Sequence, residues 1–287
     1  MLHTLPSPPP TKTSQPPARI VAGVYLRCLR RANGVMLKDS ARAAGVSVPA
    51  IIRWEQAEAP VPPAALRRLL LRYGVPGDHA DYMARRVPPQ PYVRDAHEER
   101  GFARRAPYDS WTDVAGAEAM ARYMAVMLMA DEVVQYTTGI PPGLRTEAYR
   151  GAVLGPGVCP GPDEPVIGMP RWVHKVPRAE GQRCTVLLDE TVLTRPVGGP
   201  TVMADQLRHL SCLPSQEAPG GRMVTVRILP VGYVGVIHTL GEVAEVTVHG
   251  RRMLTSLRLG PSYETGSGFA HVMGEGMRSW TQPHASS

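Results

Sequence analysis

The stretch from Gly34 to Ala57, GVMLKDSARAAGVSVPAIIRWEQA, constrains the fold more than any other part of this 287-residue chain. Small residues between Leu37 and Ala44 favour a helix that packs closely against a second one. Gly45 follows directly, and a glycine there can adopt the left-handed conformation that ends a helix. Ser47 is then placed to cap a new helix that begins at Val48, with a proline in its first turn. The sequence therefore predicts two short helices joined by a tight turn.

The second of these helices has two different faces. Ile51 and Trp54 are three residues apart, so they share the face that we expect to be core. The residues expected to point outward are Pro49, Ala50, Ile52, Arg53 and Gln56. This spacing is that of a helix-turn-helix, in which the second helix lies in the major groove of B-DNA.

From Ala18 to about Val75, the sequence resembles the helix-turn-helix of xenobiotic-response-element type transcriptional regulators. The residues that carry the resemblance are Gly34, Ala41, Gly45, Val46, Ser47, Ile51, Trp54 and Glu55. The resemblance implies that Arg30, on a preceding helix, pairs with Glu55 beneath the second helix of the motif. It also implies a regulator that binds double-stranded DNA.

The chain departs from that family at three positions that are often polar there and are held here by Leu37, Val48 and Pro49. We therefore assign most base reading to Arg53, because a guanidinium can form a bidentate contact with guanine, while aliphatic side chains can meet a thymine methyl group. The candidate DNA-contacting residues are Ser47, Pro49, Ala50, Ile52, Arg53 and Gln56, with Arg31, Lys38 and Arg42 for the phosphates.

Charge is unevenly distributed along the chain. Residues 19–86 contain twelve Lys and Arg against five Asp and Glu, whereas residues 87–287 contain nineteen against twenty. The basic excess thus coincides with the predicted helix-turn-helix, as expected for a module that neutralises phosphates. Basic residues that only solvate helical faces would not need to gather there.

Composition divides the chain into four segments. The first 17 residues contain six prolines, which favour extended, disordered backbone. The predicted segments are a disordered tail (1–17), a five-helix DNA-binding domain (18–86), a linker (87–107) and an α+β regulatory or interaction domain with a partly ordered tail (108–287). The linker has four prolines and no sustained periodicity, so we expect a hinge with some helical character over residues 96–104.

Residues 108–287 predict an α+β fold with a small sheet. A helix is expected to begin near the Ser110 cap, with methionines on an apolar face that suits either an adaptable core or a partner surface. Further helices are expected near Thr146 and after Pro200. The expected strands are 133–136, 185–188, 223–229, 243–248 and 253–259, the last two joined by a turn at His249, Gly250 and Arg251.

Part of this second half resembles actinobacterial WhiJ-like regulators, some of which are described as antitoxin-like. The resemblance rests on IPPGLRTEAYRGAV, on DETVL followed by RPVGGP and QLRHL, and on the VTVRILP strand. With the first resemblance it covers most of the chain from Ala18 to about Pro230. It implies a small partner protein for the C-terminal domain, and we expect that this domain could also form a homodimer or bind a small-molecule effector.

No catalytic or metal-binding constellation is apparent in the sequence, and no cofactor is expected. Asp189 and Glu190 are adjacent, which suits capping of a helix start better than acid–base chemistry. Asp205 and His209 fit an ordinary pair on a helix surface. The four cysteines have no spacing typical of zinc. The longest apolar run, Met124 to Ala130, is too short to cross a membrane.

These observations favour a cytoplasmic, nucleoid-associated transcriptional regulator that is not an enzyme. Its DNA-binding domain would read the major groove, and its C-terminal domain would dimerise or bind a partner or ligand. Two alternatives remain open at this point. One is a protein-interaction module whose helix-turn-helix no longer reads DNA, and the other is an unrecognised enzyme in the C-terminal domain.

Overall fold

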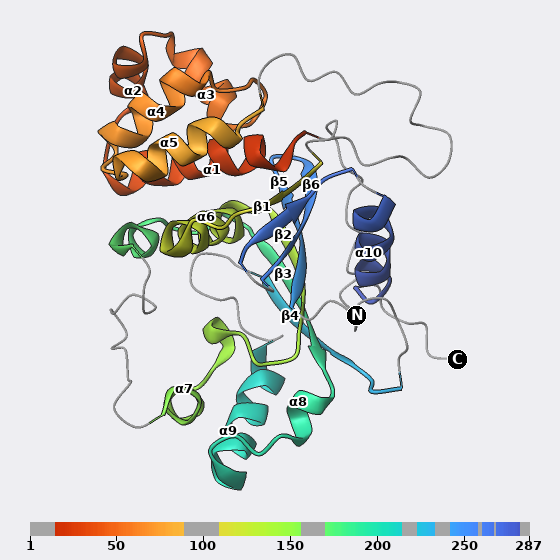
Figure 1. The fold of residues 1–287 in the computed structure, drawn as a ribbon. Coiled ribbons are helices and arrows are strands. Elements are labelled where there is room, and N and C mark those ends of the chain that lie inside the picture. Colours follow the sequence, from red (N-terminus) through yellow and green to blue (C-terminus); the bar gives the residue numbers. More distant parts are fainter. Residues whose placement is uncertain are drawn as a thin grey trace.

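The computed structural model describes residues 15–88, 109–155, 170–213, 223–232, 242–257, 260–266 and 268–281. A helical N-terminal region is followed by a C-terminal region built on a seven-stranded mixed sheet with helices around it (Figure 1). The predicted fold class is confirmed, although the sheet is larger than expected. The expected linker at 87–107 and the first 14 residues lie almost entirely outside the described residues, so the hinge remains a prediction.

Five helices form the N-terminal region, and their bounds follow the local signals in the sequence. They are α1 (Pro17–Ala32), α2 (Leu37–Ala44), α3 (Val48–Glu55), α4 (Pro63–Arg72) and α5 (Gly77–Arg86). Prolines stand in the first turn of α1, α3 and α4, where a missing N–H costs nothing. Gly45 and Gly74 adopt positive φ angles of 71° and 84° just after α2 and α4, which ends those helices.

The sheet has the strand order β1-β7-β6-β5-β2-β3-β4. Its strands are β1 (Ser110–Thr112), β2 (Glu132–Thr137), β3 (Arg183–Asp189), β4 (Met223–Leu229), β5 (Val243–Val248), β6 (Arg251–Ser256) and β7 (Ser262–Glu264). The strands β2, β3 and β4 are parallel, and all other neighbouring strands are antiparallel.

Both faces of the sheet are covered. On one face, α6 (Gly116–Met129) and α1 pack over the inward side chains of β5, β6 and β7; on the other, α10 (Gly268–Ser279) packs over β2 and β6 (Figure 1). Of the methionines of α6, Met129 is buried in this core, and Met120, Met124 and Met127 are half-buried and pack against it. At one end of the sheet lie α7 (Glu147–Leu154), α8 (Thr191–Thr194) and α9 (Gly199–Cys212) (Figure 1). Two short 3-10 helices are η2 (Pro142–Leu144), which precedes α7, and η3 (Arg171–Lys175), which contacts α1 and α6.

The first helix, α1, is buried on nearly every side because it packs against both regions. It contacts α3 on one side and α6, β1 and β7 on the other. The hydroxyl of Tyr25 on α1 donates a hydrogen bond to the carboxylate of Glu118 on α6. Nearby, Arg122 of α6 is fully buried and forms a two-pronged ion pair with Asp113. The N-terminal and C-terminal regions therefore share one continuous core.

Two local expectations for the C-terminal region are wrong. Ser110 begins strand β1 rather than capping a helix, because Trp111 stacks on Tyr263 of the neighbouring strand with ring centroids 5.3 Å apart. Arg251 belongs to β6, since His249 and Gly250 alone form the turn, with φ angles of 49° and 75°. Within the tail that was expected to be partly ordered, the described residues provide β7 and α10.

Candidate nucleic-acid interface

The turn between α2 and α3 has the geometry that its sequence predicts, except at the cap. Gly45 is left-handed, and the N–H of Val46 donates to the carbonyl of Ala41, which closes the turn. Ser47 stands at the N-cap of α3 in an extended conformation, but its side chain makes no capping hydrogen bond. The exposed hydroxyl of Ser47 is therefore not used in holding the turn.

The face of α3 opposite to the core is open to solvent. Ile51 and Trp54 are buried, as expected, at 1% and 6% exposure. The outward residues Pro49, Ile52 and Arg53 are exposed, while Ala50 and Gln56 are half-buried. Within the part of the chain that the structure describes, the outward face of α3 therefore remains available to a partner.

The three candidate phosphate contacts are also exposed. Arg31 lies in the last turn of α1, and Lys38 and Arg42 lie on α2. The Arg42 side chain is 81% exposed, and its guanidinium is 3.5 Å from the Asp39 carboxylate. A surface pair of this kind holds the side chain only weakly, so Arg42 can still turn toward a phosphate.

Arg30 and Glu55 form the pair that the sequence resemblance implies. The Nε and Nη2 atoms of Arg30 donate to the two carboxylate oxygens of Glu55 at 2.6 and 2.9 Å. Both side chains are largely buried, at 14% and 6% exposure. The hydrogen bond that Arg30 donates to Glu55 raises the pKa of Arg30 and outweighs the opposing effect of burial. The pair fixes the end of α3 to α1, directly beneath the exposed face.

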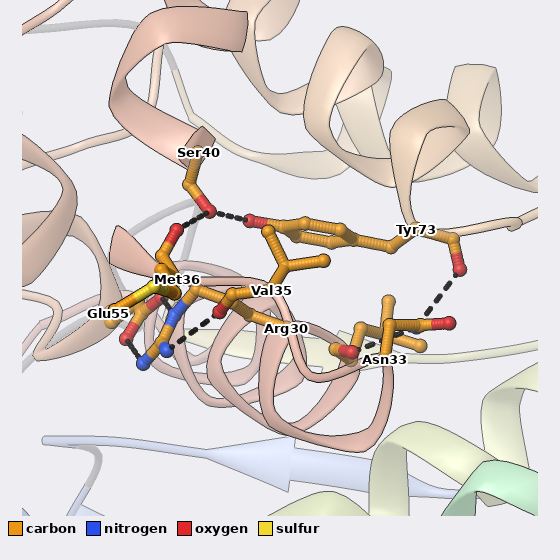
Figure 2. A network of polar contacts seen from close by, with 8 residues as sticks. Arg30, Asn33, Val35, Met36, Ser40, Glu55 and Tyr73 are labelled. Atoms are coloured by element: carbon orange, nitrogen blue, oxygen red, sulfur yellow. Dashed lines mark hydrogen bonds and ion pairs between the residues drawn. The ribbon is translucent and has the colours of Figure 1, made fainter. Parts of the chain in front are cut away.

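A network of polar contacts extends from this pair to α2 and α4 (Figure 2). Arg30 also donates to the carbonyl of Val35 at 3.3 Å. On the other side of the network, the hydroxyl of Tyr73, just after α4, donates to Ser40 of α2 at 2.8 Å. Asn33 bridges the end of α1 and the Tyr73 carbonyl. Four helices are thereby locked together, which makes α3 a rigid platform.

The end of α3 also contacts the C-terminal region and the middle of α1. The Nη1 atom of Arg251, the first residue of β6, donates to the main-chain carbonyl of Gln56 at 3.0 Å. A Cβ atom at Gly23 of α1 would lie 2.5 Å from the carbonyl oxygen of Trp54, so only glycine allows this approach. Neither contact could be predicted from local sequence patterns, because both depend on residues that are distant along the chain.

Comparison with known families agrees with this geometry. Residues 22–83 match the family model of a helix-turn-helix domain. The matched segment of this helix-turn-helix domain runs from α1 to α5 and includes Arg30, Glu55 and all nine candidate DNA-contacting residues. Residues 120–252 match a second family model, a domain of unknown function (DUF5753), which extends from α6 to Arg252 in β6. The searches of curated proteins and of solved structures found no match.

The acidic residues considered for catalysis have structural contacts. The Asp189 carboxylate accepts hydrogen bonds from the Tyr136 hydroxyl at 2.8 Å and from the Thr191 main chain at 2.9 Å. Asp205 pairs with Arg208 rather than with His209. Among the described residues, no group of three or more His, Cys, Asp and Glu is placed to hold a metal ion. None of the described helices is long and apolar enough to span a membrane.

Proposed function

We propose that this protein is a transcriptional regulator that binds double-stranded DNA through α3. The observation that carries the proposal is the exposed outward face of α3, held rigidly on a buried ion pair within a matched helix-turn-helix domain. A helix so presented can enter the major groove, as recognition helices do. The basic excess of residues 19–86 supplies the attraction to phosphates.

In this mechanism the phosphate contacts position the protein and α3 reads the sequence. Arg31, Lys38 and Arg42 bind the backbone, and Arg53 donates two hydrogen bonds to a guanine. Ile52 and Ala50 contact thymine methyl groups. In a homodimer, two α3 helices about 34 Å apart would enter successive turns of the same groove.

The C-terminal region, in this proposal, is regulatory and not enzymatic. Its contacts with α1 and with the end of α3 allow a dimer partner, a small partner protein or an effector to shift the fraction of molecules competent for DNA binding. Residues 189–210, which contain the DETVL, RPVGGP and QLRHL motifs, resemble WhiJ-like, antitoxin-like regulators, and this resemblance supports a partner protein. We expect the protein to act in the cytoplasm, on the nucleoid.

Selection from a random pool of duplexes tests the proposal directly. The full chain should enrich a preferred sequence, and footprinting on the DNA that flanks its own gene should protect a related site. The matched control is Arg53→Ala, which should lose the preference at one base position. If the full chain fails to bind duplex DNA even at low ionic strength, the helix-turn-helix is only a scaffold for protein contacts and the proposal is wrong.

A further inference from the structure

Two buried arginines lie at the junction between α1, the end of α3 and β6. Arg19, in the first turn of α1, and Arg251, the first residue of β6, are each only 5% exposed. Arg19 donates from Nη1 to the side-chain oxygen of Gln15, and Arg251 donates from Nη1 to the Gln56 carbonyl. Both acceptors are neutral, so neither contact supplies a counter-charge.

Among the residues that the structure describes, several donor atoms of the two guanidinium groups are buried and have no acceptor. These are Nε and Nη2 of Arg19 and Nε of Arg251. A buried donor without a partner loses the hydrogen bonds that water gave it, and a charged group loses most. Arginines this deeply buried are normally paired with an acid. The structure thus shows two cationic groups with unused hydrogen-bonding capacity in the same place.

The electrostatics indicate that the positive charge of Arg251 acts on Arg19. Burial lowers the pKa of Arg19, and the positive charge of Arg251 lowers it further. Burial also lowers the pKa of Arg251, while the charge of Glu58 acts in the opposite direction. Glu58 is exposed, and the ion pairs of the described residues include none with Arg19 or Arg251.

The end of α3 explains only part of this arrangement. The carbonyl groups at a helix C-terminus carry partial negative charge and stabilise a nearby cation. This accounts for the hydrogen bond from Arg251 to Gln56. It does not account for Arg19, whose Nε and Nη2 atoms find no carbonyl there.

We propose that Arg19 and Arg251 together bind a small oxyanion, a phosphate or a carboxylate, at this junction. Such a group provides both the missing acceptors and the missing negative charge, and guanidinium groups match its geometry with paired hydrogen bonds. Because both side chains are nearly fully buried, the ligand is a small anion and not the backbone of a DNA duplex. The site combines Arg19, outside both matched families, with Arg251 at the end of the second.

Thermal unfolding of the full-length chain tests the site, with phosphate, acetate or citrate exchanged for chloride at constant ionic strength. We expect a saturable rise in Tm with phosphate or with one of the carboxylates. Comparing phosphate with acetate and citrate shows which of the two chemical classes the site binds. Arg19→Gln and Arg251→Gln should each lose the saturable rise. Arg27→Gln, on the same helix, should keep it.

Two results would overturn the proposal. One is a rise of equal size in the two site variants and in Arg27→Gln, which would show a general salt effect. The other is the absence of any saturable heat when the unmodified protein is titrated calorimetrically with millimolar phosphate or citrate. This second measurement needs no variant, so it decides the question even if Arg19→Gln or Arg251→Gln does not fold.

A consequence for DNA binding rests on the function proposed above. Arg251 contacts the last residues of α3, so an anion held by it would stabilise the position of that helix. DNA affinity should then change with the anion in the wild type at constant ionic strength, and should not change in Arg251→Gln. An anion that raises Tm without altering DNA affinity would refute this coupling and leave the site itself intact.

Discussion

Gly23 of α1 lies directly against the main-chain carbonyl of Trp54 in α3, so closely that no side chain fits between the two helices. This approach sets the distance between α1 and α3. It also explains why α3 can be fixed at its end by contacts from Arg30 and from Arg251. The position of α3 therefore depends on backbone packing as well as on the buried ion pair.

Substituting Gly23 by alanine should destabilise the protein and displace α3. The added Cβ would lie 2.5 Å from the Trp54 carbonyl oxygen and 3.0 Å from that of Glu55, and backbone atoms cannot easily move away. Overpacking of this kind costs about 1–3 kcal/mol. Urea unfolding gives the change in stability, and DNA titration gives the change in affinity.

The control for that substitution is Gly151→Ala in α7, where a Cβ meets nothing within 4 Å. Alanine should stabilise this helix by about 0.5–1 kcal/mol, since glycine is the poorer helix former. Equal stability of Gly23→Ala and the wild type would show that α1 and α3 can move apart to accommodate the added Cβ without any cost in the free energy of unfolding.

Breaking the Arg30–Glu55 pair should be costly. Replacing Arg30 by methionine leaves the Glu55 carboxylate buried without its partner. Removing one partner of a buried ion pair lowers the free energy of unfolding by about 3–5 kcal/mol. Chemical denaturation of Arg30→Met, Glu55→Gln and the double variant measures the coupling. Arg42→Ala is the comparison, because its exposed pair with Asp39 is worth at most about 1 kcal/mol. Similar losses at Arg30 and Arg42 would contradict the structural role of the buried pair.

The two kinds of DNA contact should respond differently to mutation. Arg53→Ala should cost about 1–3 kcal/mol at one base position and relax specificity there. Lys38→Ala should weaken binding to all sequences alike and reduce the salt slope by about one. Fluorescence anisotropy with single-base variants of the selected site, over a range of salt, separates the two effects. A uniform loss in Arg53→Ala would mean that Arg53 contacts only phosphate.

Cysteine reactivity should follow burial. Burial raises the pKa of the Cys28 thiol to about 12, so that almost no thiolate, the reactive form, exists near neutral pH. Cys212 is exposed on α9. Iodoacetamide at pH 8 should label Cys212 and leave Cys28 unmodified until the protein is unfolded, as peptide mass spectrometry can verify. Rapid labelling of Cys28 in the native protein would show that α1 opens readily.

Stability should decline in alkaline solution. Burial is the main cause that raises the pKa of Cys28, and it also raises the pKa of Tyr25, Tyr123 and Tyr263. A raised pKa means that each of these groups holds its proton more tightly in the folded state than in the unfolded state. Their contribution to the free energy of unfolding is therefore fully present below the unfolded pKa values of about 9–10, and it declines as the pH rises above them. Urea midpoints at pH 8 and pH 10.5 should differ, with the lower midpoint at pH 10.5. Equal midpoints would argue against burial of these groups.

Local signals in the sequence were sufficient for the N-terminal helices. The helix ends at Gly45 and Gly74, and the starts at Pro49 and Pro63, depend on backbone conformations that single residue types impose. The core position of Trp54 follows from periodicity. For the same reason, the exposure of Pro49, Ile52 and Arg53 could be predicted, whereas Ala50 and Gln56 are half-buried.

Features that depend on distant partners could not be predicted in this way. Ser110 looks like a helix cap, yet it begins a strand because Trp111 stacks on Tyr263 from far along the chain. Arg19 belongs to a basic helix that appears solvated, yet the C-terminal region buries it. Segment composition gives no information on which surfaces meet.

The burial of α1 on both sides has a consequence for how such proteins can diversify. This helix packs against the N-terminal helices and against the C-terminal region. Separating the two regions would therefore leave an exposed apolar surface on each of them. A recombination event that joined this helical N-terminal region to a different C-terminal domain would give a stable protein only if that domain packed against the face of α1 that now contacts α6, β1 and β7.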